Sequence, residues 1–413
     1  MNPLNTITKE LDEYFIPLNE MYPKAYNKNS TGPYSKLNVI LANGTEFESV
    51  WFMHQFARHT DNKEILEKLA IIRTQEQQQQ KRISCLKPLN ESILETTIAY
   101  EQLAVELTAS LAKNEKDKNN KFALDFALLE DFDHLYRFSN MLLIDKGIES
   151  ERLVGQYTEI MPGRPTIAEY RYPSDNLSEH MIAKKADLFS KLAGCIITAA
   201  EQQTMNYYMN IAQWYKNDLG RKLYAEIGMV EEEHVTQYES LKDPTISWLE
   251  QWAMHEYAEC YLYYSLMENE EDSHLRGIWE SHYEMECCHL KTVVELLEKY
   301  EKIPYSNVFG DGEFPEALTF GKNKEYIRNV IAETLTLTKQ QNKYVEVDSL
   351  NKASKFKFYQ DHFVGNNSEK VASHMIINKA IEMFGEDYRY QESKHPIKGL
   401  SNRKVDNTTI ARP

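Results

Sequence analysis

The sequence predicts an all-α chain. Glycine and proline are scarce, at 15 and 13 of 413 residues, and the stretches between them are rich in the helix formers Ala, Leu, Glu, Lys and Gln. No stretch shows the sustained alternation of apolar and polar residues that a strand needs. Breaks are expected at Gly44, Pro88 and Pro244, and in the segments 162–165 and 310–312.

The composition narrows the class of protein. The chain has 47 Lys and Arg against 63 Asp and Glu, a formal net charge of -16. This acid excess argues against nucleic acid or an anionic membrane as a partner, and it suits cations. No signal peptide or membrane helix is expected, and the five cysteines lack the CxxC spacing of a zinc ribbon or rubredoxin-type iron centre. We expect a reduced, cytoplasmic protein.

Three sets of residues share one spacing. In each set an acid stands three residues before a histidine, on the same helix face, and a glutamate stands thirty residues before that acid. The sets are Glu101 with Asp131 and His134, Glu201 with Glu231 and His234, and Glu256 with Glu286 and His289. In each set a polar stretch that can end a helix lies near the midpoint between the glutamate and the acid–histidine pair. The rise per residue of an α-helix is fixed, so a helix of about fifteen residues, a turn and a second helix of about fifteen residues bring the chain back to its starting height. Each set therefore predicts an α-hairpin.

A shift of 155 residues reveals a fourth hairpin. When the sequence is aligned with itself at this shift, Glu46 aligns with Glu201, Glu76 with Glu231 and Gln79 with His234. The same shift superimposes the other two sets and aligns the segment from Cys85 with the segment from Ser240 without a gap. We interpret the chain as a tandem duplication, which predicts an internal pseudo-dimer.

The duplication predicts five segments in order. They are an N-terminal segment at 1–39, a four-helix module at 40–143, a linker at 144–177, a second four-helix module at 178–300 and a C-terminal helical and irregular extension at 301–413. In each module a short turn with a proline joins the two hairpins, so that four acids lie at one level.

The C-terminal extension shows two amphipathic stretches, at 325–339 and 370–384, between loops. Its tail, 394–413, is expected to be extended or mobile.

Four carboxylates at one level in apolar surroundings require protons or cations, because ionised acids there repel one another and lose their hydration. The second module offers four carboxylates and two imidazoles without a thiolate, which suits iron or manganese. The predicted ligands are Glu201, Glu231, His234, Glu256, Glu286 and His289.

A glutamate on each of two helices, with Glu-x-x-His on the other two, is the ligand pattern of di-iron carboxylate bundles. On these residues the sequence resembles the ferritin-like superfamily, which includes rubrerythrins and bacterioferritins. The resemblance implies two iron ions, or iron with manganese, in the second module. It also implies oxidoreductase chemistry with dioxygen or peroxide and an external electron donor. Glu259 resembles an extra glutamate of rubrerythrins that can exchange with a histidine ligand.

The first module keeps the pattern incompletely, because Gln79 replaces a histidine and Asp131 is shorter than glutamate. Two alternatives are open: a further metal site, or a copy that has lost its site and serves as a partner half. The residues of that site would be Glu46, Glu76, Glu101, Asp131 and His134.

The pairing of the hairpins is also open. Ferritin-like bundles have a long crossover between their second and third helices, whereas Glu256 follows His234 by only 22 positions in the sequence. The long connection lies instead at 144–177. In the alternative, hairpins 101–134 and 201–234 form one bundle across it, and Asp131 and His134 join the site.

Three functions remain open at this level. The leading hypothesis is a di-iron-type oxidoreductase that reacts with dioxygen or peroxide. The others are a ferroxidase or iron-handling protein without an organic substrate, and a metal-free structural helical-bundle protein. The sequence indicates no catalytic residue, substrate or reductant.

Overall fold

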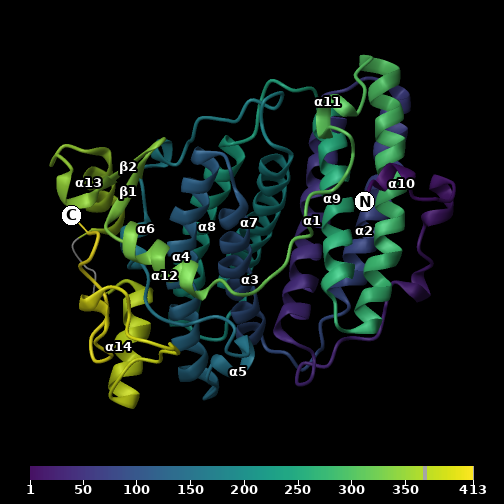
Figure 1. The fold of residues 1–413 in the computed structure, drawn as a ribbon. Coiled ribbons are helices and arrows are strands. Elements are labelled where there is room, and N and C mark those ends of the chain that lie inside the picture. Colours follow the sequence, from purple (N-terminus) through teal and green to yellow (C-terminus); the bar gives the residue numbers. More distant parts are fainter. Residues whose placement is uncertain (366–369, 413) are drawn as a thin grey trace. The chain divides into compact units, whose positions relative to one another are not determined.

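The computed structural model describes residues 1–365 and 370–412 and confirms the all-α fold (Figure 1). Its one sheet in that part of the chain has two short strands, β1 (Leu337–Gln340) and β2 (Lys343–Glu346), which pair antiparallel. Across the same residues, none of the helices combines the length and apolarity needed to traverse a bilayer.

Eight long helices form the four predicted hairpins. They are α1 (Pro33–Ala57), α2 (Lys63–Ser84), α3 (Ile93–Asn114), α4 (Lys118–Lys146), α7 (Leu188–Trp214), α8 (Asp218–Ser240), α9 (Trp248–Asn269) and α10 (Ser273–Glu301). The shorter helices are α5 (Glu151–Val154), α6 (Thr166–Glu169), α11 (Ser306–Phe309), α12 (Lys324–Thr334), α13 (Lys355–Tyr359) and α14 (Ala372–Phe384).

The helix starts repeat with the 155-residue shift. A side-chain oxygen of the N-cap residue accepts a backbone N–H of the first turn in six of the long helices. The caps form three related pairs: Asn62 and Asn217, Ser92 and Ser247, and Asp117 and Asp272. Both serines belong to a capping box with a glutamate three residues later. The residues that set where these helices begin therefore recur at the 155-residue spacing.

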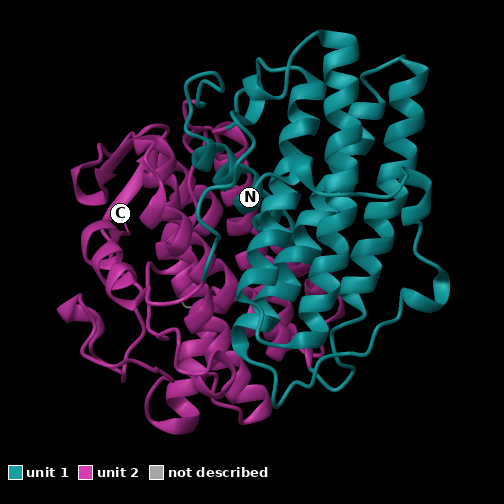
Figure 2. Cartoon of the chain, turned by 45° about the vertical axis from the view of Figure 1, so that its right-hand side comes forward, with its two compact units in different colours: residues 1–91, 180–203, 242–319 teal, residues 92–179, 204–241, 320–413 magenta. Residues whose placement is uncertain are grey.

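The chain forms two compact units (Figure 2). Unit 1 consists of residues 1–91, 180–203 and 242–319, and unit 2 consists of 92–179, 204–241 and the chain from Phe320 onward. In unit 1, α1 packs against α9 and α2 against α10. Unit 2 contains α3, α4, α8 and the C-terminal part of α7, and α4 packs against α8.

These units contradict the predicted modules at 40–143 and 178–300. The turns at 87–90 and 242–245 lead from one unit into the other and do not close a bundle. The segment 144–177 is a crossover within unit 2, as in the alternative pairing. The physical reason is that acid spacing fixes only the height of each residue along its helix. Which hairpins lie side by side depends on the packing of their faces, which spacing does not encode.

The ends of the chain also differ from the expected segments. Helix α1 begins at Pro33, inside the predicted N-terminal segment. The predicted extension at 301–413 is divided, because residues up to 319 belong to unit 1 and the rest to unit 2. In unit 2, α12 and α14 pack against α4, in agreement with the amphipathic stretches expected at 325–339 and 370–384. Residues 337–339 of the first stretch lie in β1 instead of a helix.

The C-terminal tail is packed into unit 2. Arg137 donates to both oxygens of Asp406 at 2.7 and 2.6 Å, and both side chains are buried. The tail up to residue 412 is therefore held in place by a buried ion pair, so the alternative of a mobile tail is wrong. Pro413 lies outside the described residues.

Gly44 does not break a helix, contrary to expectation, but lies inside α1 where α7 passes close to it. A Cβ at this position would lie 3.3 Å from the carbonyl oxygen of Ala199 and 2.7 Å from Gln203 Nε2. The glycine therefore serves helix packing in unit 1.

Gly163 packs the crossover of unit 2 onto α4, and its replacement tests that packing. A Cβ there would lie 2.4 Å from the carbonyl oxygen of Leu129. We expect Gly163→Ala to lower the free energy of unfolding by about 1–3 kcal/mol, measured by urea denaturation. The control is Gly277→Ala, at an exposed position of α10 with no atom within 4 Å. It should raise the free energy of unfolding by up to about 1 kcal/mol. Wild-type stability in Gly163→Ala would contradict this packing.

Candidate metal centres

Unit 2 contains a buried cluster of acids and histidines from three helices. Glu101 lies on α3, Asp131 and His134 on α4, and Glu231 and His234 on α8, and none of these side chains is exposed to solvent. Glu101, His134 and Glu231 offer ligand atoms within 4.8 Å of one another, and so do Asp131, Glu231 and His234. These groups could hold a metal ion.

Glu231 lies between the two histidines of the cluster. Its Oε1 is 3.0 Å from His134 Nδ1, and its Oε2 is 3.2 Å from His234 Nδ1. Asp131 Oδ1 lies 3.4 Å from the same nitrogen of His234. The two imidazole centroids are 6.1 Å apart. One carboxylate thus faces a separate nitrogen donor with each of its oxygens, which is the arrangement of a bridging ligand.

The outer nitrogen of each histidine is held by another buried carboxylate. His134 Nε2 lies 2.9 Å from Glu169 Oε2, and His234 Nε2 lies 2.9 Å from Glu130 Oε2. Such partners fix the orientation and tautomer of a ligating histidine, so that Nδ1 is the nitrogen that could bind a metal ion. The crossover delivers Glu169 on α6, so the long connection takes part in building the site.

Arg171 keeps Glu130 charged. Burial raises the pKa of Glu130, but the Arg171 guanidinium and His234 outweigh it and lower the pKa to about 2. Arg171 donates to Glu130 and also lies 3.2 Å from Glu233 Oε2. Because Glu130 is ionised at neutral pH, it accepts from His234 Nε2–H.

The acids of the cluster itself shift in both directions: the two histidines lower the pKa of Glu231 against the effect of burial, whereas the pKa values of Asp131 and Glu101 are raised. Burial raises the pKa of Asp131 to about 7, against the opposing charge of His234. Burial also raises the pKa of Glu101 well above its usual range. The Tyr208 hydroxyl donates to Glu101 Oε1 at 2.5 Å, while Glu101 Oε2 accepts no hydrogen bond from the described residues. Without a cation, this cluster therefore favours bound protons.

Glu201, the fourth predicted carboxylate of this hairpin pair, is buried on α7. It belongs to the part of the helix grouped with unit 1 and stands three residues before the part in unit 2. It precedes Tyr208 by two helical turns, so the two side chains lie on one face of the same continuous helix.

Unit 1 contains a second buried cluster with a single histidine. Glu76, Glu256, Glu286 and His289 offer ligand atoms within 4.8 Å of one another, and Glu46, Glu76 and Glu259 do the same. His289 Nδ1 lies 3.0 Å from Glu76 Oε1 and 3.2 Å from Glu286 Oε2. His289 Nε2 donates to Gln75 Oε1 at 2.9 Å, so an amide here takes the place of the outer carboxylate.

Gln79 occupies the position of the missing histidine in unit 1. Its amide nitrogen donates to Glu286 Oε1 at 2.5 Å. Trp252 Nε1 donates to Glu256 Oε1 at 2.6 Å, and the Tyr263 hydroxyl donates to Glu46. Several carboxylate oxygens of unit 1 are therefore held by neutral donors.

The structure divides the complete six-residue set predicted for the second module. Glu231 and His234 belong to the cluster of unit 2 with Glu101, Asp131 and His134, whereas Glu256, Glu259, Glu286 and His289 belong to unit 1 with Glu46 and Glu76. The two-histidine cluster therefore includes residues of the predicted first module.

Sequence reasoning missed the residues that hold the histidines, namely Glu130, Glu169 and Gln75. Glu130 and Gln75 each stand directly before a cluster acid, Asp131 or Glu76. They could have been found from that position only once the hairpin pairing was known, because each supports a histidine of another hairpin.

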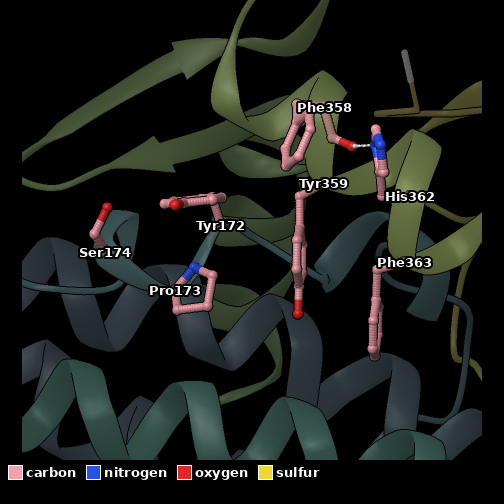
Figure 3. A pocket seen from close by; sticks show the side chains of 7 residues that line it. All are labelled: Tyr172, Pro173, Ser174, Phe358, Tyr359, His362 and Phe363. Carbon is pink, nitrogen blue, oxygen red and sulfur yellow. Dashed lines mark hydrogen bonds between the residues drawn. The ribbon is translucent and has the colours of Figure 1, made fainter.

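Unit 2 also has an open pocket with a volume of 580 Å³ (Figure 3). Aromatic side chains line it, including Tyr172, Phe358, Tyr359 and Phe363. The Tyr359 and Phe363 rings stack at 5.0 Å. The pocket contains none of the cluster ligands, and its Tyr172 directly follows Arg171.

Comparisons with known proteins found no matching family model, no matching curated protein and no matching solved structure. The chemistry of the two clusters is therefore argued from their own residues.

Loss of Arg171 should remove the nearest guanidinium from the buried charge of Glu130 and leave only the more distant one of Arg164, at 4.0 Å. We expect Arg171→Met to lower the free energy of unfolding at pH 7 by about 3–5 kcal/mol. Arg152→Met is the control, because its side chain is 74% exposed in a 3.5 Å pair with Glu149. It should cost less than about 1 kcal/mol. Equal costs for the two variants in urea denaturation would contradict the role of Arg171.

The pH profile gives a second measure of this pair. Glu130 has a folded pKa of about 2, below its ordinary value of 4.5. Its stabilising contribution is thus fully present above about pH 4.5 and is lost as the pH falls towards 2. We expect the stability difference between wild type and Arg171→Met to shrink across that window. A constant difference would assign the cost to packing alone.

Proposed function

We propose that unit 2 binds two redox-active metal ions, of iron or of iron with manganese, and acts as an oxidoreductase on dioxygen or peroxide with electrons from an external donor. The observation that carries this proposal is Glu231, which faces a different histidine nitrogen with each of its carboxylate oxygens. A single carboxylate between two imidazoles suits a pair of cations better than one.

The donor set supports the choice of metal. The cluster offers carboxylate oxygens and imidazole nitrogens and no thiolate, a combination that suits iron and manganese. Burial of Glu101 and Asp131 raises their pKa values, so a cation in the cluster would relieve the cost of ionising them. The ligands from unit 2 would be Glu101, Asp131, His134, Glu231 and His234.

Glu201 would complete the set as a sixth ligand. It shares a face of α7 with Tyr208, and Tyr208 already donates to Glu101. The resulting set of four carboxylates and two histidines has the same donor types as the set that the resemblance to the ferritin-like superfamily implies, with Asp131 in place of one glutamate. We propose membership of that superfamily on this basis.

The bound metals would supply redox equivalents and Lewis acidity. The chain's own contribution is orientation and exclusion of water. Glu130 holds the His234 ring, and Tyr208 holds one oxygen of Glu101. Phe138 and Tyr224 pack around Tyr208 at centroid distances of 5.2 and 5.6 Å and shield the cluster from solvent.

For unit 1 we propose a less complete metal site. His289 provides the single imidazole, and Gln79 lies where unit 2 has a second one. Glu76, Glu256 and Glu286 would complete the first coordination group, while Glu46 and Glu259 could neutralise a further cation. Weaker binding than in unit 2 follows from the fewer nitrogen donors.

Replacement of the bridging carboxylate tests the proposal. We expect Glu231→Gln to remove about two metal equivalents per chain, measured by elemental analysis after reconstitution with ferrous iron or manganese. The matched control is Glu232→Gln, because Glu232 is the exposed neighbour on the same helix, and it should retain the metal. Equal metal content in the two variants would remove Glu231 from the ligands. A metal-free wild type after reconstitution would favour the structural alternative.

The reaction with excess ferrous iron in air separates an enzyme from an iron-handling protein. We expect oxidation of the bound ions followed by turnover with peroxide and an added reductant. Many oxidised iron equivalents retained per chain, without peroxide turnover, would contradict the oxidoreductase proposal and favour the ferroxidase alternative. Glu231→Gln is the control, since it should lose the reaction in unit 2.

A further inference from the structure

A series of aromatic rings leads away from the cluster of unit 2. It begins at Tyr208, whose hydroxyl donates to Glu101 at 2.5 Å. The ring centroid of Tyr208 lies 5.6 Å from that of Tyr224 on α8, which in turn lies 5.4 Å from that of Tyr215. Phe138 on α4 lies beside the first gap, 5.2 Å from Tyr208 and 4.8 Å from Tyr224. The three tyrosines therefore form a continuous series of ring contacts that begins at a proposed metal ligand.

Tyr215 ends the series at the turn between α7 and α8. Its side chain is buried, whereas Trp214 directly before it is 77% exposed and Lys216 directly after it is also exposed. Gly220 on α8 makes room for the buried ring, because a Cβ there would lie 2.3 Å from Tyr215 Cδ1. The series of rings thus reaches a point one residue away from an exposed indole.

The hydroxyl of Tyr215 has a carboxylate as its hydrogen-bond acceptor. It donates to Asp145 Oδ2 at 2.6 Å, and Asn217 Nδ2 donates to the same oxygen at 3.1 Å. Lys216 Nζ lies 3.5 Å from that oxygen. An oxidised phenol is a strong acid, so a tyrosine loses an electron most easily when a base receives its proton at the same time. Tyr215 meets that condition through Asp145.

The environment of the Tyr224 hydroxyl is different. It lies 2.7 Å from Thr97 Oγ1, which itself donates to the backbone carbonyl of Ile93 at 2.9 Å. Thr97 therefore accepts from Tyr224, and a neutral hydroxyl is a poor base. The ring of Tyr224 can bridge its two neighbours, while its phenol is harder to oxidise than that of Tyr215.

We propose that Tyr215 is a one-electron relay, through which electrons from the external donor enter unit 2 at the α7–α8 turn and reach the cluster across the rings of Tyr224 and Tyr208. This inference rests on the proposed oxidoreductase function of unit 2. The proposed ligands are buried, out of reach of a donor molecule in solvent. Because electron tunnelling weakens steeply with distance, closely spaced rings between the surface and the cluster speed the transfer.

The other repeat lacks such a series of rings at its corresponding positions. The 155-residue shift pairs each of the three tyrosines with a residue that is not aromatic. The pairs are Tyr208 with Met53, Tyr215 with Thr60 and Tyr224 with Leu69. The relay is therefore particular to the hairpin of α7 and α8, which serves the cluster with two histidines.

Each electron moves together with the movement of one proton at Tyr215. Tyr215 loses an electron towards the cluster, and its phenolic proton moves to Asp145, which leaves a neutral tyrosyl radical. The external donor then supplies one electron, the proton returns from Asp145, and the phenol is restored. Two such rounds deliver the two electrons that reduce one peroxide molecule. Its O–O bond breaks, it takes up two protons from solvent, and two water molecules form, while two donor molecules are each oxidised by one electron.

Electron paramagnetic resonance of the full-length, metal-loaded protein tests the relay. After anaerobic reaction with peroxide without a reductant, we expect a tyrosyl radical that gains a fluorine hyperfine splitting in the variant Tyr215→3-fluorotyrosine. Tyr215→Phe should lose this radical, whereas Tyr207→Phe should keep it. Tyr207 is the matched control, because its ring also lies close to that of Tyr208, at 5.8 Å. A tyrosyl radical without the fluorine splitting, or none in protein that consumes peroxide, would overturn the relay.

The rate of electron entry provides a second measurement. Hexaammineruthenium(II), an outer-sphere one-electron donor, serves as the probe in anaerobic turnover with peroxide. We expect Tyr215→Phe and Asp145→Asn to oxidise this donor about tenfold more slowly than wild type, at a metal content equal to that of wild type. Tyr207→Phe should keep the wild-type rate. Equal rates in wild type and Tyr215→Phe would contradict the relay.

Two variants of Tyr224 separate the role of its ring from that of its hydroxyl. Tyr224→Leu should slow oxidation of the donor about tenfold, whereas Tyr224→Phe keeps the ring and should restore the wild-type rate. Equal rates in the two variants would exclude a path across this ring. Because leucine at a fully buried tyrosine can impair folding, the fluorotyrosine spectrum decides the role of Tyr215 without it.

Metal content and peroxide consumption separate the relay from the proposed function. Protein that binds metal and consumes peroxide equally fast with and without the Tyr215 hydroxyl would overturn the relay and leave the proposed function standing. Protein that binds no metal after reconstitution, or binds it without consuming peroxide, would overturn the proposed function and the relay with it.

Discussion

The structure depends on the burial of several carboxylates at the centre of each helical unit. Acids without exposure to water must be neutralised by protons, by paired cations or by hydrogen bonds. In unit 2 the neutralising groups are two histidines, one facing each oxygen of Glu231. Outside them, the buried carboxylate of Glu130 pairs with the guanidinium of Arg171. The crossover that carries Arg171 is therefore part of the site as well as a connection.

The two clusters differ although their hairpins share one pattern. The four hairpins share one spacing and related N-caps, so each unit can place its acids at one level. Unit 2 retains an imidazole on both acid–histidine helices. Unit 1 has Gln79 in place of one imidazole. The same pattern of hairpins thus supports two buried clusters that differ in their nitrogen donors.

The sequence predicted the helices and the level of the acids, because both follow from local rules. Capping residues such as Ser92 and Ser247 set the helix starts, and the helical rise sets the height of Glu101 relative to Asp131. The lateral pairing of hairpins could not be predicted, since it depends on contacts such as that of Gly44 with α7. For the same reason Glu130 and Gln75 escaped notice, because each supports a histidine of another hairpin.

The most direct measurement of the central claim is an anomalous diffraction map at the iron and manganese absorption edges of crystals of the reconstituted protein. The account predicts two peaks in unit 2, one on either side of Glu231 and each next to the Nδ1 atom of one histidine, His134 or His234. A map of metal-reconstituted crystals without density at Glu231, or with a single peak distant from both histidines, would contradict it.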